Sequence, residues 1–498
     1  MTNLLPENIN IKHPDKLYIG GEWVSPKSGR SIKVVSPHTE EVCAIVAEAG
    51  PEDVNDAVAA AREAFDNGPW PSTSVEERAG YLRRMGEILG ARSAELSAAF
   101  THQVGGLASM APIGAMLGTK NMFDYAEVGE KFEWVTSQPS SVMGYTANVI
   151  HEPVGVVAAI TPWNMPYPCI THKIAPALMA GCPVIMKPSP ETPLEGYIIA
   201  EAAEEAGLPP GVVNLVTAER EAADQLVQNP GVDKIAFTGS SAVGKHIANV
   251  AGGRMARLTL ELGGKSPAII LDDFPTEIAG PLLARTITVL SGQVCGMLSR
   301  AIVPAHRHDE IAAAIAEEMK KIKVGSPLDP ASEMGPVAMK RQLERIEHYV
   351  EVGVKEGATL AHGGKRVEGL KGYYFEPTLF TNVDNSMTIA QEEIFGPVLS
   401  LIPARDVDHA VELANETIYG LNAAVLTNDN DAAFAIGRRV RAGSVAQNGM
   451  NADFELPFGG FKCSGVGREG GAAGLKSYTE TKIILLQDAT ATGQPLFG

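Results

Sequence analysis

The spacing of hydrophobic residues changes along the chain. Between Pro51 and Val104, apolar side chains recur every three to four positions, and this period predicts amphipathic helices. After about Ile150, short β-prone runs such as 154–161 and 234–239 alternate with helical patterns. Strands that alternate with helices predict a parallel sheet with helices on both faces.

A second alternating set begins at Pro267 and predicts a second α/β domain. It includes a strand-like run at 301–306 and a helical run at 309–322, while 287–291 fits a helix or a strand. Two polar, β-prone runs, 135–150 and 477–486, stand apart from both sets. Isolated strands have unpaired edges, so we expect these edges to pair with a partner subunit.

Length and composition narrow the possible classes of protein. A chain of 498 residues is too long for one ordinary core, so we expect two or three domains with clefts between them. The net charge of -18 and the lack of basic runs argue against nucleic acid as a partner. No apolar run approaches the roughly 20 residues that span a bilayer, so no membrane segment is expected. Five scattered cysteines without a CxxC pair suggest free thiols in the cytoplasm.

A glycine-rich turn follows the strand-like run 234–237. Gly239, Ser240 and Gly244 lie where a helix would begin, and a helix N-terminus favours phosphate. The turn nearly matches a P-loop, but His246 replaces the hydroxyl residue that binds magnesium, which disfavours ATP. The GxGxxG fingerprint is also absent. A tight turn without any ligand is an equal alternative.

Three further residues could carry chemistry, and each has a simpler interpretation. Cys295 lies among small residues where a loop could expose its thiol, although most such thiols are inert. Glu261 lies between leucines, where burial should raise its pKa toward that of a general base; lone strand glutamates are usually surface residues. Asn164 follows a strand, where it could donate to an oxyanion or cap a turn.

Considered together, the motifs point to one family. They run in the order TPWN, MKPS, FTGSxxxG, LELGGKSP, GQxC, EEIFGPV and PFGGFKxSGxGRE. This combination resembles the aldehyde dehydrogenase superfamily, in its NAD(P)-dependent, non-acylating form, from about Leu17 to about Leu486.

The resemblance implies an α/β fold in three parts and a homo-oligomer, either a dimer or a tetramer. A Rossmann-like NAD(P)-binding domain with a five-strand core would comprise 1–131 and 152–263. An α/β catalytic domain would comprise 264–463, and a small β oligomerisation element would comprise 132–151 and 464–498.

The resemblance also implies roles for residues. Cys295 corresponds to the nucleophile, Glu261 to the base that activates water, and Asn164 with the Cys295 backbone N–H to the oxyanion hole. Glu469 resembles a residue on a proton-exit route. The implied cofactor is NAD, with NADP possible, and the positions matching its contacts are Ile160, Thr161, Pro162, Trp163, Lys187, Ser189, Pro190, Gly239, Ser240, Gly244, Leu262, Glu393 and Phe395.

Positions matching the substrate tunnel of the family are mostly apolar and include no arginine. They are Met165, Cys169, His172, Val294, Met297 and Phe458. Together with the small Gly296, they predict an apolar aldehyde, which could be aliphatic, terpenoid or aromatic. Pro190 stands where NAD-preferring relatives often have glutamate, which leaves NADP open. His306 and His308 fit a solvated helix start, so no metal is expected.

Two alternatives to this function remain open. An acylating relative would transfer the acyl group to coenzyme A instead of water, and Glu261 argues against that because a thiol acceptor has less need of a water-activating carboxylate. A structural relative would have kept the fold without the activity. The joint presence of Cys295, Glu261 and Asn164 argues against this second alternative.

Overall fold

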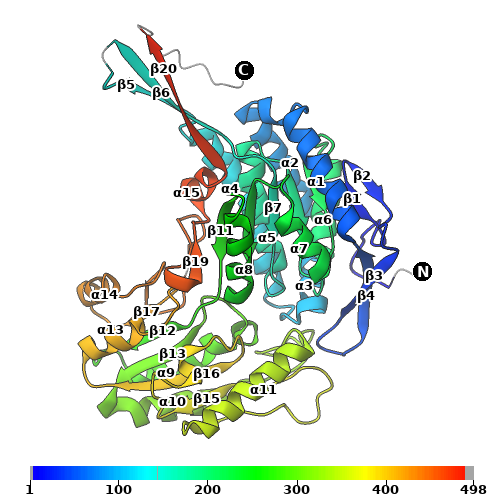
Figure 1. The fold of residues 1–498 in the computed structure, drawn as a ribbon. Coiled ribbons are helices and arrows are strands. Elements are labelled where there is room, and N and C mark those ends of the chain that lie inside the picture. The colour runs from blue at the N-terminus through cyan, green and yellow to red at the C-terminus, as the bar shows by residue number, and fades with distance from the viewer. Residues whose placement is uncertain (1–3, 143, 452, 488–498) are drawn as a thin grey trace.

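The computed structural model describes residues 4–142, 144–451 and 453–487 (Figure 1). The first helical block contains α1 (Pro51–Asp66), α2 (Val75–Ala91) and α3 (Ser93–Val104), which confirms the helices expected over that stretch. Ser74 caps α2 and accepts a hydrogen bond from the backbone N–H of Glu77. The hydrophobic period did not predict the 21-residue helix α4 (Ala111–Lys131), which follows this block.

The first large sheet has the strand order β19-β11-β10-β7-β8-β9-β1-β2. Its five central strands are parallel, as expected for a Rossmann-like core. These strands are β7 (Val157–Ile160), β8 (Val184–Lys187), β9 (Val213–Leu215), β10 (Lys234–Thr238) and β11 (Arg257–Glu261). The residues of β7, β8 and β9 are all buried, because helices cover both faces of a parallel sheet.

The remaining elements of the first sheet lie at its edges and on its faces. Antiparallel strands complete both edges, and the chain between the central strands forms helices. The edge strands are β1 (Leu17–Ile19), β2 (Glu22–Val24) and β19 (Gly465–Val466). The helices are α5 (Pro166–Ala180), α6 (Leu194–Glu205), α7 (Arg220–Gln228) and α8 (Ser241–Gly252).

The second large sheet confirms the second α/β set. Its order is β14-β15-β16-β13-β12-β17-β18, with only β14 antiparallel to its neighbour. Its strands are β12 (Ser266–Ile270), β13 (Leu298–Pro304), β14 (Thr359–His362), β15 (Thr378–Thr381), β16 (Val398–Ala404), β17 (Ala424–Leu426) and β18 (Ala446–Gln447).

Helices pack beside this second sheet (Figure 1). They are α9 (Thr276–Thr288), α10 (His308–Met319), α11 (Lys340–Lys355), α12 (Thr388–Gln391), α13 (Val407–Asn415) and α14 (Asn430–Gly437). The undecided stretch 287–291 is not a strand: its first two residues end α9, and the rest belongs to the turn η2 (Val289–Gly292), in which the helix is broken. The other 3₁₀ turns are η1 (Trp70–Ser72), η3 (Ala305–Arg307) and η4 (Lys462–Ser464).

The two isolated β-prone runs pair with each other. They form a three-stranded antiparallel sheet of β5 (Val135–Pro139), β6 (Tyr145–Pro153) and β20 (Thr479–Gln487), which extends away from the two large sheets in Figure 1. The helix α15 (Gly471–Lys476) leads into β20. Residues 488–498 of the expected oligomerisation element lie outside the described residues.

A fourth, two-stranded sheet lies near the N-terminus. It pairs β3 (Arg30–Val35) with β4 (Val42–Glu48). All five cysteines are free thiols, as expected from their scattered positions. Within the described ranges, no helix is both long enough and apolar enough to cross a membrane.

Candidate active site

A cleft of about 820 Å³ brings together most of the residues singled out in the sequence. Its walls come from the carboxyl ends of β7, β10 and β11, from α4 and α5, and from loops of the second α/β set. Ligands of open α/β sheets bind at this end of the strands. The predicted residues that line the cleft are Pro162, Trp163, Asn164, Met165, Cys169, His172, Gly239, Ser240, Glu261, Leu262, Val294, Cys295, Glu393, Phe395, Phe458 and Glu469.

The other predicted residues do not line this cleft. Met297 is 4% exposed and packs in the core of the second α/β set, so its side chain is separated from the predicted substrate tunnel. Ile160 ends β7 with its side chain in a core cluster. The residues placed outside the cleft are Ile160, Thr161, Lys187, Ser189, Pro190, Gly244 and Met297.

The backbone before Cys295 adopts an uncommon conformation. Leu290, Ser291 and Gly292 all have positive φ, with values of 48°, 53° and 74°. A side chain at Gly292 would place its Cβ only 2.1 Å from the Gly396 carbonyl oxygen, so only glycine fits there. Strained backbone of this kind gathers at functional sites.

Cys295 lines the cleft. Burial raises the pKa of its thiol, and the neighbouring Cys169 and Glu393 add to the effect. The backbone N–H of Gly296 acts in the opposite direction, but it does not outweigh burial. In the protein alone, the net effect is therefore a raised pKa of the Cys295 thiol. A base or a neighbouring cation has to promote thiolate formation.

The two glycines of the LELGGKSP motif allow two close approaches. A Cβ at Gly264 would lie 2.6 Å from the Cys295 carbonyl oxygen, and a Cβ at Gly263 would lie 2.2 Å from a Glu393 carboxylate oxygen. The Gly264 N–H donates to Glu393 Oε1 at 2.9 Å. Burial raises the pKa of Glu393 to about 7. The glycine pair thus holds Glu393 beside the cysteine loop.

Asn164 links the first sheet to the cysteine loop. It follows β7, is 6% exposed, and its Nδ2 donates to the Gln293 carbonyl at 2.8 Å. The side chain therefore reaches across to the loop of Cys295, and this contact differs from the local turn cap that was the simpler interpretation. Its amide is held in position to donate to an oxygen that develops beside Cys295.

Glu261 is a buried carboxyl without a partner. It ends β11 and is 3% exposed, and neither carboxylate oxygen has a hydrogen-bond partner among the described residues. Burial raises its pKa well above the usual range, and the negative charge of Glu469 raises it further. A carboxylate with a raised pKa inside a cleft suits the role of general base. The structure thus agrees with the pKa direction expected from the flanking leucines.

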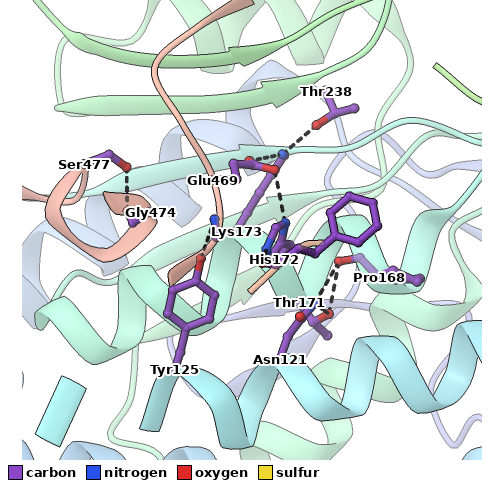
Figure 2. Close-up of polar contacts among 12 residues, drawn as sticks. Asn121, Tyr125, Pro168, Thr171, His172, Lys173, Thr238, Glu469, Gly474 and Ser477 are labelled. Carbon is purple, nitrogen blue, oxygen red and sulfur yellow. Dashed lines mark hydrogen bonds and ion pairs between the residues drawn. The ribbon is translucent and has the colours of Figure 1, made fainter. Parts of the chain in front are cut away.

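Glu469 has the opposite environment (Figure 2). Its Oε1 accepts from Lys173 Nζ at 2.6 Å, and its Oε2 lies 3.4 Å from His172 Nδ1. Burial by itself would raise the pKa of Glu469, but the Lys173 ammonium and the His172 contact outweigh it and lower the pKa to about 2. Lys173 also donates to Thr238 Oγ1 at 2.6 Å. Glu469 is therefore a fixed negative charge near Glu261.

The glycine-rich turn between β10 and α8 has the form predicted from the sequence, a strand followed by a turn and the start of a helix. Ser240 caps α8, and its hydroxyl accepts from the Val243 N–H at 3.4 Å. A Cβ at Gly244 would lie 2.4 Å from the Leu262 side chain, so this glycine lets the helix pack closely against the end of β11. Gly239 and Ser240 border the cleft, which leaves the N-terminus of α8 directed at it.

A buried lysine lies at the carboxyl end of β8. Lys187 ends this strand and is 7% exposed, and burial lowers its pKa to about 8. Glu191 accepts a hydrogen bond from Ser189 and forms an ion pair with Arg341 at 2.5 Å. The carboxylate of Glu191, the residue after Pro190, is thus held by Ser189 and Arg341.

An aromatic wall and helix α4 complete the cleft. The rings of His172 and Phe454 meet edge to face with their centroids 5.8 Å apart, and the ring centroids of Phe454 and Phe458 are 4.9 Å apart. Sequence reasoning missed Phe454 and the α4 residues that line the cleft, namely Leu117, Lys120, Asn121 and Asp124. Nothing in the sequence of 111–131 shows which face of α4 meets the cleft.

Comparison with known proteins identifies the family. The family model described as "Aldehyde dehydrogenase family" matches residues 23–484. The chain belongs to the aldehyde dehydrogenase family. The resemblance drawn from the ordered motifs is thereby confirmed, as is the α/β fold class.

Individual relatives of this aldehyde dehydrogenase match over nearly their full length. Geranial dehydrogenase from Castellaniella defragrans is 41% identical, with 94% of this chain and 98% of the relative covered. The crystal structure of a Mycobacterium tuberculosis aldehyde dehydrogenase complexed with NAD+ has a TM-score of 0.94 and 41% identity, covering 97% and 100% of the two chains. A mutant of aldehyde dehydrogenase C from Pseudomonas syringae, complexed with NAD+ and octanal, has a TM-score of 0.93 and 40% identity, covering 97% and 99%.

Proposed function

We propose that this aldehyde dehydrogenase oxidises an apolar aldehyde to the carboxylic acid, with NAD as the hydride acceptor and a thioester on Cys295 as the intermediate. The observation that carries the proposal is the single cleft that holds Cys295, Asn164 and the unpaired, raised-pKa carboxyl of Glu261. A nucleophile, an oxyanion donor and a base are the groups that such a reaction requires.

The residues of the cleft, with Lys187 at the end of β8 outside its lining, fit a dinucleotide. The N-terminus of α8 with Gly239 and Ser240 suits a pyrophosphate, and the buried Lys187 suits a ribose. The rings of Trp163 and Phe395 meet edge to face with their centroids 5.3 Å apart. Both residues line the cleft together with Glu393 and Cys295. When bound, NAD would supply the hydride acceptor and a cationic ring near the thiol. Two of the similar structures are complexes with NAD+, which supports this choice.

The residues of the chain account for the first half of the reaction. The Cys295 thiol must lose its proton although burial raises its pKa, and Glu261 is the unpaired base in the same cleft. The thiolate sulfur attacks the aldehyde carbon and gives a thiohemiacetal. The Asn164 amide and the Cys295 N–H then stabilise the oxyanion, and one such donor typically contributes about 3 kcal/mol. Loss of hydride leaves the acyl thioester.

Glu261 also accounts for the second half. Once Glu261 has passed the thiol proton to solvent, it takes a proton from water, and the oxygen of that water attacks the thioester carbonyl. The carboxylic acid leaves, and the Cys295 thiolate that is released takes the proton back from Glu261. Near Glu261, Lys173 donates both to Glu469 and to Thr238, which gives the cleft a second hydrogen-bonded polar group. We propose that Glu469 supports proton exit from Glu261 as a fixed charge and does not itself carry the proton.

The substrate is inferred from the walls of the cleft. Met165, Cys169, Val294 and Phe458 are apolar, and Phe454 extends this surface. A second carboxylate on the substrate would lose its hydration against these side chains, and Lys120 in the cleft lining already pairs with Asp124 and Glu455. Decanal should therefore exceed succinic semialdehyde in kcat/KM. A geranial dehydrogenase and an octanal complex among the relatives support an apolar substrate. Equal efficiency for succinic semialdehyde would contradict this assignment.

The direct test follows reduced nicotinamide by absorbance. Purified protein with NAD and decanal should give steady turnover without coenzyme A, and the product should be decanoic acid. A requirement for coenzyme A would instead indicate the acylating alternative, and no absorbance change with any aldehyde would indicate a structural relative.

Cofactor preference has its own test. Pro190 supplies no carboxylate for the ribose hydroxyls, and Glu191 is held by Ser189 and Arg341, so NADP is an alternative cofactor. Pro190→Glu should raise the ratio of NAD to NADP efficiency, because its carboxylate would repel a 2'-phosphate. A ratio that does not change would place Pro190 away from the ribose.

We also propose that the sheet of β5, β6 and β20 is the oligomerisation element. The exposed Ile483, Ile484, Leu485 and Leu486 lie on β20, and an exposed apolar strand favours pairing with a second copy. Light scattering coupled to size-exclusion chromatography should give a dimer or a tetramer. Five free thiols fit a cytoplasmic enzyme.

A further inference from the structure

A cluster of charged side chains joins the first α/β set to the second beside the catalytic cleft. Glu191, in the loop after β8, forms an ion pair with Arg341, the second residue of α11. Gln342, the next residue of α11, lines the cleft. We call Lys187, Ser189, Glu191 and Arg341 the ribose cluster, because on the proposed function the adenosine ribose of the cofactor binds at Lys187.

Lys187 has a buried ammonium that lacks a partner. The residue is 7% exposed, and its ammonium has no hydrogen-bond or ion-pair partner among the described residues, although solvent still reaches Nζ. Burial lowers the pKa of Lys187 to about 8, and the charges of Glu191 and Glu219 act in the opposite direction. The ammonium form therefore predominates at pH 7. A buried cation without a partner is costly, so an oxygen atom of a ligand is its natural partner.

The carboxylate of Glu191 is held from two sides. It accepts a hydrogen bond from Ser189 and pairs with Arg341 Nη1 at 2.5 Å. Burial by itself would raise the pKa of Glu191, but these two contacts outweigh it and lower the pKa. The group is therefore ionised at pH 7. Such a carboxylate can accept a hydrogen bond from a ribose hydroxyl, whereas it repels a 2'-phosphate.

Arg341 supplies a cation at the same place. Its side chain is 65% exposed, and only Nη1 contacts Glu191. Within the part of the chain that the structure describes, Nε and Nη2 have no hydrogen-bond partner. A guanidinium carries five N–H donors in a planar fork that matches a phosphate. Arg341 can therefore keep its contact with Glu191 and still donate to a phosphate.

We propose that Arg341 admits NADP by binding its 2'-phosphate, and that Glu191 favours NAD by accepting a hydrogen bond from the ribose hydroxyls. The inference rests on the proposed function and extends it from the hydride end of the cofactor to the adenosine end. Cofactor choice then depends on an ion pair between the two α/β sets, because each partner of that pair recognises a different cofactor.

The contact is tested by binding, without aldehyde or turnover. The probes are adenosine 2',5'-bisphosphate and AMP, which differ only in the 2'-phosphate and carry no nicotinamide. Calorimetry gives the ratio of their dissociation constants. Arg341→Ala should weaken the bisphosphate about tenfold relative to AMP, because a charge-assisted hydrogen bond is lost. NADP relative to NAD should weaken by a similar factor. Arg341→Lys should give an intermediate ratio, because an ammonium cannot make the bidentate contact.

Glu191 gives the reciprocal test. Glu191→Gln keeps the size of the side chain but removes the charge that repels a phosphate, so the bisphosphate should bind severalfold more tightly relative to AMP. This gain should be smaller in the Arg341→Ala background, because the two side chains act on the same phosphate. Lys340→Ala is the matched control: it removes an exposed charge one position from Arg341, and the ratio should stay within about twofold of wild type.

The outcomes separate this inference from the proposed function. Turnover of decanal with NAD, together with a bisphosphate to AMP ratio that Arg341→Ala does not change, would overturn the inference alone. Equal effects of Lys340→Ala and Arg341→Ala would also overturn it, because the effect would then be one of overall charge. A wild-type protein that binds neither NAD nor NADP would overturn the proposed function itself.

Discussion

Two buried carboxyl groups near the candidate active site have opposite properties. Glu261 is 3% exposed and Glu469 is 5% exposed, yet the pKa of Glu261 is well above its usual range and that of Glu469 is about 2. Burial raises both pKa values, so burial cannot explain the difference. Lys173 and His172 contact Glu469, whereas no described residue hydrogen-bonds the carboxylate of Glu261. The partners decide which carboxyl can accept a proton.

The two groups also act on each other. Because Glu469 stays ionised, its charge raises the pKa of Glu261, and Lys173 partly offsets this effect. The fixed negative charge of Glu469 thus raises the pKa of the proposed base, Glu261. On our proposal, Glu261 performs the proton transfer and Glu469 sets the conditions for it.

The largest expected effect comes from removing the nucleophile that Glu261 serves. Cys295→Ala should bind NAD but release no reduced nicotinamide with decanal, since no thiohemiacetal can donate hydride. The measurement is absorbance under excess aldehyde, with cofactor binding followed by fluorescence. Cys463→Ala, a thiol outside the cleft lining, is the matched control. Turnover in Cys295→Ala would remove the covalent mechanism.

Glu261→Gln should lower steady-state turnover by roughly 10²- to 10⁴-fold, the usual contribution of a general base. One turnover should remain, because hydride transfer precedes thioester hydrolysis. We expect a burst approaching one reduced nicotinamide per site, and an acyl mass on the peptide that contains Cys295. The burst will be slower to the extent that Glu261 also deprotonates the thiol. Wild-type turnover in this variant would show that the base is another residue.

Glu469→Gln should destabilise the fold by about 3 kcal/mol, because Lys173 would then be a buried charge without its anion. Denaturant unfolding at pH 7 measures this difference. Glu480→Gln removes an exposed ion pair with Arg257, and it should change stability by less than about 1 kcal/mol. Since the folded-state pKa of Glu469 lies below its ordinary value, its contribution is complete above about pH 4.5 and is lost as the pH falls toward about 2. Equal unfolding curves for the two variants would contradict the ion-pair assignment.

The smallest expected effect is a shift of the pH profile. Turnover should rise as Glu261 deprotonates, so its acidic limb reports the raised pKa. Glu469→Gln removes the charge that raises this pKa, and the limb should therefore move to lower pH. For each protein, the rate at pH 6 is divided by its own maximal rate, and this ratio should be severalfold higher in Glu469→Gln than in wild type. A limb that stays in place would show that Glu469 does not adjust Glu261.

Local patterns predicted much of the site because its residues follow recognisable strand ends and turns. Asn164 after β7, Glu261 at the end of β11 and the Gly239 turn all meet at one edge of a parallel sheet. Residues far apart in the sequence meet at this edge, and the ordered motifs showed which residues they are. Met297 shows the limit, since it lies two positions from Cys295 and yet packs in the core.

The sequence by itself determined the family, the parallel sheets and the identity of the candidate nucleophile, base and oxyanion donor, because these depend on local spacing and on ordered motifs. Only the tertiary structure decided which acid is paired. Lys173 lies 296 positions from Glu469, and no local pattern joins them. Protonation and cavity shape depend on partners across the fold, so they arise only when the chain is packed.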